Sequence, residues 1–260
     1  MRTFSLWILL AACGGAPSPA ATAPIRGEQA RSGASSSAPR AAEDRGDTPL
    51  RLLDFVVMNE GYGPADRAAY TAEVQAIARA HGVTLAQSYR VDQVMAGEVD
   101  GVLDVNIWRV PGPEALQALG EDPRYQALTR LRDRIHDMSK LTLYLAEPVT
   151  EVGQLRSEHV LVDLVFLNEG ADLRERASYV SDITPIARRH GARPVQTYRI
   201  LRHLAGRGEG AVELNLWEVD SPGALQATLA DPDYQAHIAR RDRIHDMGRL
   251  TMMLAHGEPR

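Results

Sequence analysis

Apolar side chains after residue 50 recur with two different periods. Across residues 102–110 they alternate with polar ones, as in a strand whose two faces differ. Between Pro64 and His81 they recur at helical spacing, as Tyr70, Val74 and Ile77 show. The pattern predicts strands at about 50–58, 84–94, 102–110 and 140–148, and helical segments at 64–81 and 113–138, the second broken near residues 120–123.

Two short signals mark helix boundaries. His81-Gly82 is typical of a helix end, because Gly tolerates the positive φ found there. Asp122-Pro123 is typical of a helix start, with Asp as the N-cap and Pro as the first helical residue.

The same series of segments occurs twice. Asn59-Glu60-Gly61 recurs as Asn168-Glu169-Gly170, and this offset of 109 residues continues without a gap to the last strand. The heptad "RDRIHDM", at Arg132–Met138 and Arg241–Met247, shares the offset, so duplication accounts for its recurrence. We therefore predict an α+β fold of two tandem ferredoxin-like units, each β-α-β-β-α-β, at residues 50–147 and 158–256.

Each predicted sheet has one fully apolar face and one amphipathic face. We expect the apolar face, with Leu53 and Ile107, to hold the helices. The other face would be too aromatic to leave in water, so the two sheets should pack on each other and close one barrel within the chain. The residues predicted to line this barrel are Asp54, Met58, Asp104, Asn106, Trp108, Tyr144, Asp163, Glu213, Asn215, Trp217 and Met253.

The first 49 residues have the character of a leader and a tether. A short apolar run ends in Leu10-Ala11-Ala12-Cys13, which resembles a bacterial lipobox, and Cys13 is the only cysteine. We expect residues 1–12 to be a signal peptide and residues 13–49, rich in Ala, Pro, Ser and Gly, to be a disordered tether. A lipid on Cys13 would hold the protein in the cell envelope. Because Gly14 is not Asp, the outer membrane is the favoured address, facing the periplasm or the cell surface. An ordinary signal peptide or a misplaced start codon would also explain this segment.

Charge and motifs exclude several function classes. The net charge of −5 provides no basic surface for nucleic acid. The sequence lacks the known metal-binding and phosphate-binding motifs, so no metal or other cofactor is predicted. Haem would need an axial ligand, but each candidate histidine has a simpler role. His81 and His190 cap helices, and His136 and His245 suit the negative end of a helix dipole.

A resemblance narrows the fold. Tyr89-Arg90, the strand around Asn106 and Trp108, the "DPxYQA" start of a helix at Asp122 and the helix arginine Arg132 resemble the DUF1330-type members of the dimeric α/β-barrel superfamily. The resemblance covers both copies. It implies a barrel that usually needs two chains and here could need one. It implies no settled function, because the superfamily includes cofactor-independent monooxygenases, lactone isomerases, haem proteins and members without known activity.

Two functions remain open. In the first, the barrel binds a small apolar or aromatic molecule, with Trp108 and Trp217 in contact and Asn106 and Asn215 orienting it. In the second, the pocket belongs to a cofactor-independent oxygenase or isomerase, with a buried carboxylate as the base. The candidate bases are Asp54, Asp104, Asp163 and Glu213. Arg132 and Arg241 are expected either to form ion pairs on the helix surface or to reach a carboxylate ligand.

Overall fold

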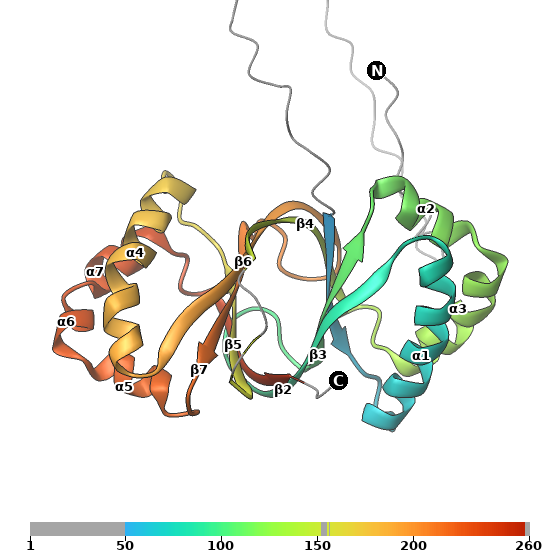
Figure 1. The fold of residues 1–260 in the computed structure, drawn as a ribbon, viewed down its shortest axis with the longest axis horizontal. Helices are drawn as coiled ribbons and strands as arrows, with labels where there is room; N and C mark the ends of the chain where they lie inside the picture. The colour runs from blue at the N-terminus through green and yellow to red at the C-terminus, as the bar shows by residue number, and fades with distance from the viewer. Residues whose placement is uncertain (1–49, 152–154, 156, 258–260) are drawn as a thin grey trace, which may run out of the picture. The chain divides into compact units, whose positions relative to one another are not determined.

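The computed structural model describes residues 50–151, 155 and 157–257, which belong to one compact unit (Figure 1). The predicted signal peptide, the lipidation site Cys13 and the predicted tether at residues 13–49 lie outside the described residues.

The first half of this unit has the predicted order of strands and helices. Its second helical segment is broken where expected, because the Asp122 side chain accepts a hydrogen bond from the Arg124 amide and starts a new helix at Pro123. Gly82 follows the first helix with a φ of +73°, which confirms the predicted helix end. The elements are β1 (Leu50–Val57), α1 (Pro64–Ala80), β2 (Thr84–Ala96), β3 (Val102–Val110), α2 (Pro113–Glu121), α3 (Pro123–Ile135) and β4 (Thr142–Glu151).

The second half repeats this order, with one difference. Its last helical segment is divided once more, between Gln235 and Ile238, where the first half has the continuous helix α3. The elements are β5 (His159–Val165), α4 (Leu173–Arg189), β6 (Ala192–Ala205), β7 (Glu213–Val219), α5 (Ala224–Ala230), α6 (Pro232–Gln235), α7 (Ile238–Ile244) and β8 (Thr251–Gly257).

The eight strands close one antiparallel barrel in the order β1-β3-β2-β8-β5-β7-β6-β4. The two halves are joined twice, by β2 with β8 and by β4 with β6. The barrel occupies the centre of Figure 1, with α1–α3 outside it on one side and α4–α7 outside it on the other. The prediction that the barrel closes within one chain is therefore confirmed.

The barrel interior is apolar, which overturns the predicted assignment of the strand faces. Leu53, Phe55 and Ile107 are fully buried and pack in one cluster with Val162 and Leu164 of the other half. Register places Asp54 opposite Asn106 on β1 and β3, so these polar side chains share the other face of the sheet. That face lies under the helices. The interior positions predicted for Asp54, Asp104, Asn106, Trp108, Asp163, Glu213, Asn215 and Trp217 are wrong.

Two of the predicted lining residues do face the interior. Tyr144 and Met253 are fully buried members of the interior cluster, on the equivalent strands β4 and β8. The Tyr144 hydroxyl donates to the Gly208 carbonyl at 2.9 Å, so its polar end is satisfied at the barrel wall. Met58 lies just beyond β1, in an isolated bridge with His136.

Candidate functional site

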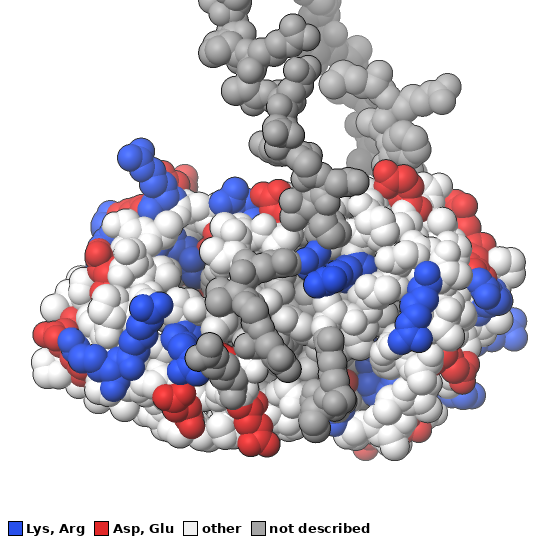
Figure 2. Space-filling model, viewed as in Figure 1, with Lys and Arg blue, Asp and Glu red and all other residues white. Residues whose placement is uncertain are grey.

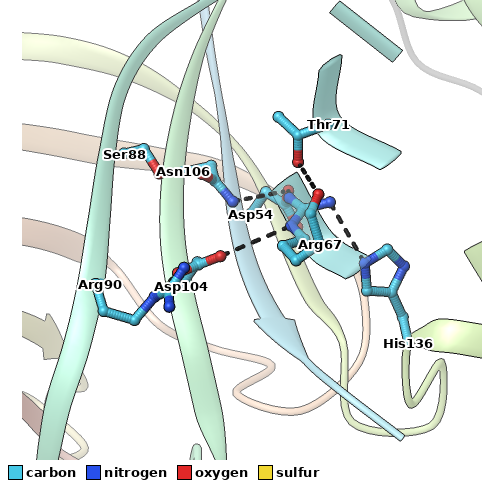
Figure 3. A network of polar contacts seen from close by, with 8 residues as sticks. All are labelled: Asp54, Arg67, Thr71, Ser88, Arg90, Asp104, Asn106 and His136. Atoms are coloured by element: carbon cyan, nitrogen blue, oxygen red, sulfur yellow. Dashed lines mark hydrogen bonds and ion pairs between the residues drawn. The ribbon is translucent and has the colours of Figure 1, made fainter. Parts of the chain in front are cut away.

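A charged cluster lies between the sheet and the helices of the first half (Figure 3). Arg67 of α1 lies on the buried stripe of that helix, three residues before Tyr70. Its Nη2 donates to Asp54 Oδ2 of β1 at 3.2 Å, and its Nε lies 3.8 Å from Asp104 Oδ2 of β3. One buried guanidinium therefore faces two buried carboxylates.

The strands supply further partners that balance this cluster. Arg90 Nε of β2 donates to Asp104 Oδ1 at 2.5 Å, which gives Asp104 a second cation. Asp54 also accepts a hydrogen bond from Asn106 Nδ2 at 3.4 Å. Asn106 in turn accepts from the Ser88 hydroxyl at 2.7 Å. The first half thus holds two carboxylates against two arginines, as Figure 3 shows.

The heptad histidine completes the cluster. His136 follows α3, is 1% exposed, and has its Nε2 3.4 Å from Arg67 Nη1. A guanidinium only donates, so Nε2 is the accepting nitrogen of a neutral ring. Burial and then the charge of Arg67 lower the pKa of His136 to about 3, which agrees with this neutral form. Its ring also packs edge-on against Tyr70, with centroids 5.0 Å apart.

The second half has an equivalent cluster, with different partners. Arg176 of α4 donates through Nη1 to Glu213 Oε2 of β7 at 2.5 Å, and its Nη2 lies 3.6 Å from Asp163 Oδ2 of β5. Asn215 donates to Asp163 at 3.5 Å and accepts from Thr197. Because Asn106 and Asn215 both hydrogen-bond the carboxylate beside them, the duplicated unit keeps its polar network as well as its fold.

Among the described residues, the ion pair between Arg90 and Asp104 in the first half has no equivalent in the second half. Arg199 occupies the position equivalent to Arg90, but its ion pair is with Glu147 of the other half, at 3.7 Å. Within the described residues, Arg176 is therefore the only residue that forms an ion pair with Glu213. The second cluster carries two carboxylates against one directly paired guanidinium.

Two atoms of the second cluster also lack hydrogen-bond partners among the described residues. They are Asp163 Oδ1 and Arg176 Nε, both buried. In the first cluster, Arg67 Nε faces Asp104 at 3.8 Å, and His136 Nδ1 is likewise buried without a partner among the described residues. A buried acceptor or donor without a partner lowers the stability of the folded state, and here the two atoms belong to neighbouring side chains.

The electrostatics of the two carboxylates beside Arg176 follow from their burial. Burial raises the pKa of the Asp163 carboxyl to about 6, against the opposing charge of Arg176. Burial also raises the pKa of Glu213, again opposed by Arg176. For His245, burial and then Arg176 lower the pKa to about 4, so the ring is neutral near pH 7. Its Nδ1 lies 3.0 Å from the Arg241 carbonyl, which only accepts, so Nδ1 carries the proton.

The sequence predictions for the remaining site residues have mixed outcomes. Trp217 packs under the helices of the second half with Tyr179 and Ile183, not in the barrel. Arg132 and Arg241 form ion pairs with the next residue in the chain, Asp133 and Asp242, at 2.7 Å in both copies. These pairs agree with the expected ion pairs on the helix surface.

Arg67 and Arg176 are the cluster residues that the sequence prediction missed. They lie on the apolar stripe of α1 and α4, each three residues before a buried tyrosine, and are 5% and 4% exposed. The signal was available. An arginine kept in both copies at a core-facing helix position needs a buried anionic partner.

The described residues also bear on metal binding, membrane insertion and surface charge. Among the described residues, no group of three or more His, Cys, Asp or Glu side chains is placed to hold a metal ion. Of the described helices, none is long and apolar enough to cross a membrane. On the face shown in Figure 2, basic and acidic side chains are interspersed.

Comparison with solved structures identifies the fold. An anthrone oxidase-like protein superposes with a TM-score of 0.51 at 16% identity, covering 82% of this chain and 93% of that one. The fold is that of the dimeric α/β barrel. A mutant chlorite dismutase from Candidatus Nitrospira defluvii gives a TM-score of 0.49 at 11% identity, covering 82% of this chain and 92% of its own. No family model and no curated protein matches the chain. At these identities the likeness concerns the fold alone.

Proposed function

We propose that the second half binds a small molecule between its sheet and its helices and transfers a proton there. Asp163 is the proton acceptor, and Arg176 stabilises the negative charge that forms on the substrate. The observation that carries this proposal is the pair of buried atoms without partners, Asp163 Oδ1 and Arg176 Nε. One ligand that donates to the first and accepts from the second would satisfy both.

The chemistry follows from the properties of these groups. A carboxylate with a pKa near 6 is a stronger base than an ordinary aspartate and is still ionised at neutral pH. It can take a proton from a C–H or O–H bond next to a carbonyl group. The oxygen that becomes negative would accept the Arg176 Nε–H. Return of the proton to another atom completes an isomerisation, whereas an oxygenase would in addition consume dioxygen.

The site under the helices replaces the barrel interior as the candidate binding region. The interior cluster includes Tyr89, Tyr198, Phe55 and Phe166, all fully buried, and the carboxylates lie on the opposite face of the sheet. A barrel-lining carboxylate base is therefore not supported by the packing. The first half is less suited to this chemistry, because its Arg67 Nε faces Asp104 and the buried atom of its cluster without a partner among the described residues is a histidine nitrogen, His136 Nδ1, and not a carboxylate oxygen.

The wider setting of this function rests on the sequence. We propose that the two halves are ferredoxin-like units of DUF1330-like type that arose by duplication. We further propose that Cys13 carries a lipid, and that a tether of residues 13–49 holds the barrel at the outer membrane. The lipobox-like Leu10-Ala11-Ala12-Cys13 supports this anchor.

Hydrogen–deuterium exchange tests the proton transfer without knowledge of the natural substrate. Hydroxyacetone in D₂O exchanges the hydrogens beside its carbonyl when a base removes them, and NMR follows the loss of signal. The full chain should accelerate this exchange above buffer, with a rate that rises as pH increases through about 6, as Asp163 ionises. Asp163→Asn should lower the protein-dependent rate by about 10²-fold or more, the range of general-base effects.

Asp54→Asn is the matched control, because Asp54 is the equivalent residue of the first half. It should leave the exchange rate near that of the wild type. Equal rates for the wild type and Asp163→Asn would rule out Asp163 as the base. Loss of exchange in Asp54→Asn alone would assign the function to the first half.

A further inference from the structure

Glu213 stands out in the second cluster because of its charge. Its Oε2 accepts from Arg176 Nη1 at 2.5 Å, and its side chain is 8% exposed. This pairing occupies one edge of the guanidinium and leaves Nε as the donor without a partner. Any ligand that reaches Nε therefore lies on the same guanidinium as a buried carboxylate.

The charges of the second cluster indicate which ligands this position tolerates. Asp163 and Glu213 face Arg176, while Arg199, which lies opposite Glu213 on β6 and whose charge also acts on it, forms its ion pair with Glu147. His245 adds no positive charge, because its Nδ1–H is held by the Arg241 carbonyl and its ring is neutral. With both carboxylates ionised, the ion pairs of Arg176 hold two negative charges against one positive charge. A second anion would meet like charges in a region of low dielectric constant, which is unfavourable.

The hydrogen-bonding requirement excludes a ligand that can only donate, such as an ammonium group without an oxygen atom beside it. Arg176 is 4% exposed and its Nε–H needs an acceptor, which an ammonium group cannot supply. The ligand must also offer a donor to Asp163 Oδ1. A neutral molecule with a hydroxyl group next to a carbonyl oxygen meets both demands.

We infer that Glu213 makes the second-half site selective for neutral hydroxy-carbonyl ligands and excludes carboxylates. This inference rests on the proposed binding site and specifies its substrate class. Glu213 acts as a specificity-determining residue through the charge it places beside Arg176. The first half provides the internal comparison, because Asp104, at the equivalent position, is shared by Arg67 and Arg90.

The test compares probes that differ in charge and little else. The aromatic pair is 2-hydroxyacetophenone and salicylate, and the smaller pair is hydroxyacetone and glycolate. Calorimetric titration of the full chain should show binding of a neutral probe, with the matched anion at least 10-fold weaker. The smaller pair separates exclusion by charge from exclusion by size.

Two substitutions of Glu213 separate its charge from its shape. Glu213→Gln should narrow the preference for the neutral probe over the anion by about 10-fold, whereas Glu213→Asp, the residue type found in the first half, should keep it. Asp104→Asn is the matched control and should leave the preference unchanged. Thermal unfolding of each variant confirms that it is folded.

The outcomes are distinct. Equal or tighter binding of the anion by the wild type would overturn the inference, and so would unchanged discrimination between the neutral probe and the anion in folded Glu213→Gln. Absence of binding by both neutral probes would also count against it. The exchange assay with Asp163→Asn reports separately on the proposed proton transfer, so selectivity can fail while that function stands.

Discussion

Replacing Arg67 by Met should destabilise the protein strongly, because Arg67 is the cation between two buried carboxylates. The Asp54 and Asp104 side chains are 12% and 6% exposed, and Arg67 lies 3.2 Å and 3.8 Å from them. Methionine keeps much of the side-chain volume and removes only the charge and the hydrogen bonds. Breaking a buried ion pair by removing one partner costs about 3–5 kcal/mol of unfolding free energy. For a domain of ordinary stability, about 5–15 kcal/mol, that is a large fraction.

Urea unfolding, followed by far-ultraviolet circular dichroism, gives this free energy. Arg124→Met is the control, because Arg124 lies closer to its partner, 2.7 Å from Asp122, but its side chain is 62% exposed. It should change stability little, since exposed ion pairs contribute little. The loss in Arg67→Met should shrink at lower pH, because burial raises the pKa of Asp54 and its protonation removes the uncompensated charge. A loss in Arg67→Met no larger than that in Arg124→Met would refute the account of this cluster.

Four further predictions address pH, assembly and the anchor. The pKa of Asp163 is about 6 in the folded protein and its ordinary value is 3.8, so between these pH values the folded state binds more protons than the unfolded state. The free energy of unfolding should therefore fall by about 2–3 kcal/mol as pH rises from 3.8 to 6. Urea titrations at each pH should show that Asp163→Asn lacks this component. His136 has the opposite effect, because its lowered pKa costs stability as pH falls from 6.5 towards 3, and His136→Gln should flatten that acid limb. Residues 50–260 should be monomeric in light scattering, because the barrel closes within the chain, and a stable dimer would contradict this. Metabolic labelling with palmitate in a bacterium with two membranes should disappear in Cys13→Ala, and persistence of the label would exclude the lipid anchor.

The sequence allowed much of the architecture to be predicted, because duplication and local signals act within short segments. The boundaries of α1 and β3, the break before Pro123 and the positive φ of Gly82 depend on neighbouring residues, and the structure has them as expected. Closure of the barrel could be predicted because each strand has two differing faces and neither can be left in water.

The sequence pattern could not show which face of each strand points into the barrel. Leu53, Asp54 and Phe55 are all at most 9% exposed, so alternation separates two buried sets without showing which one faces inward. The prediction placed polar groups in the barrel because it assigned the apolar face to the helices. It overlooked that a helix can itself carry a buried cation. Arg67 and Arg176 neutralise the polar face from the helix side, and this arrangement depends on contacts between distant segments.

The heptad "RDRIHDM" contributes to the site through its histidine. The sequence favoured a role for His136 and His245 at the helix terminus, and both do occupy the C-terminal cap position of a helix. Only the three-dimensional structure shows that His136 Nε2 also meets the buried Arg67. Helical periodicity shows on which face of a helix a residue lies, but it does not show which residue of another segment contacts it.

The central claim is that a ligand binds at Arg176, under the helices of the second half, and not at Arg67 or inside the barrel. The most direct test follows the arginine Nε–H signals in ¹⁵N–¹H correlation spectra while 2-hydroxyacetophenone or hydroxyacetone is added to the full chain. Arg176→Lys and Arg67→Lys assign the two signals. The account predicts a saturable shift of the Arg176 Nε–H signal, with the Arg67 signal and the Met253 methyl signal unchanged. A shift of the Arg67 signal or of the Met253 methyl group, with Arg176 unaffected, would contradict it.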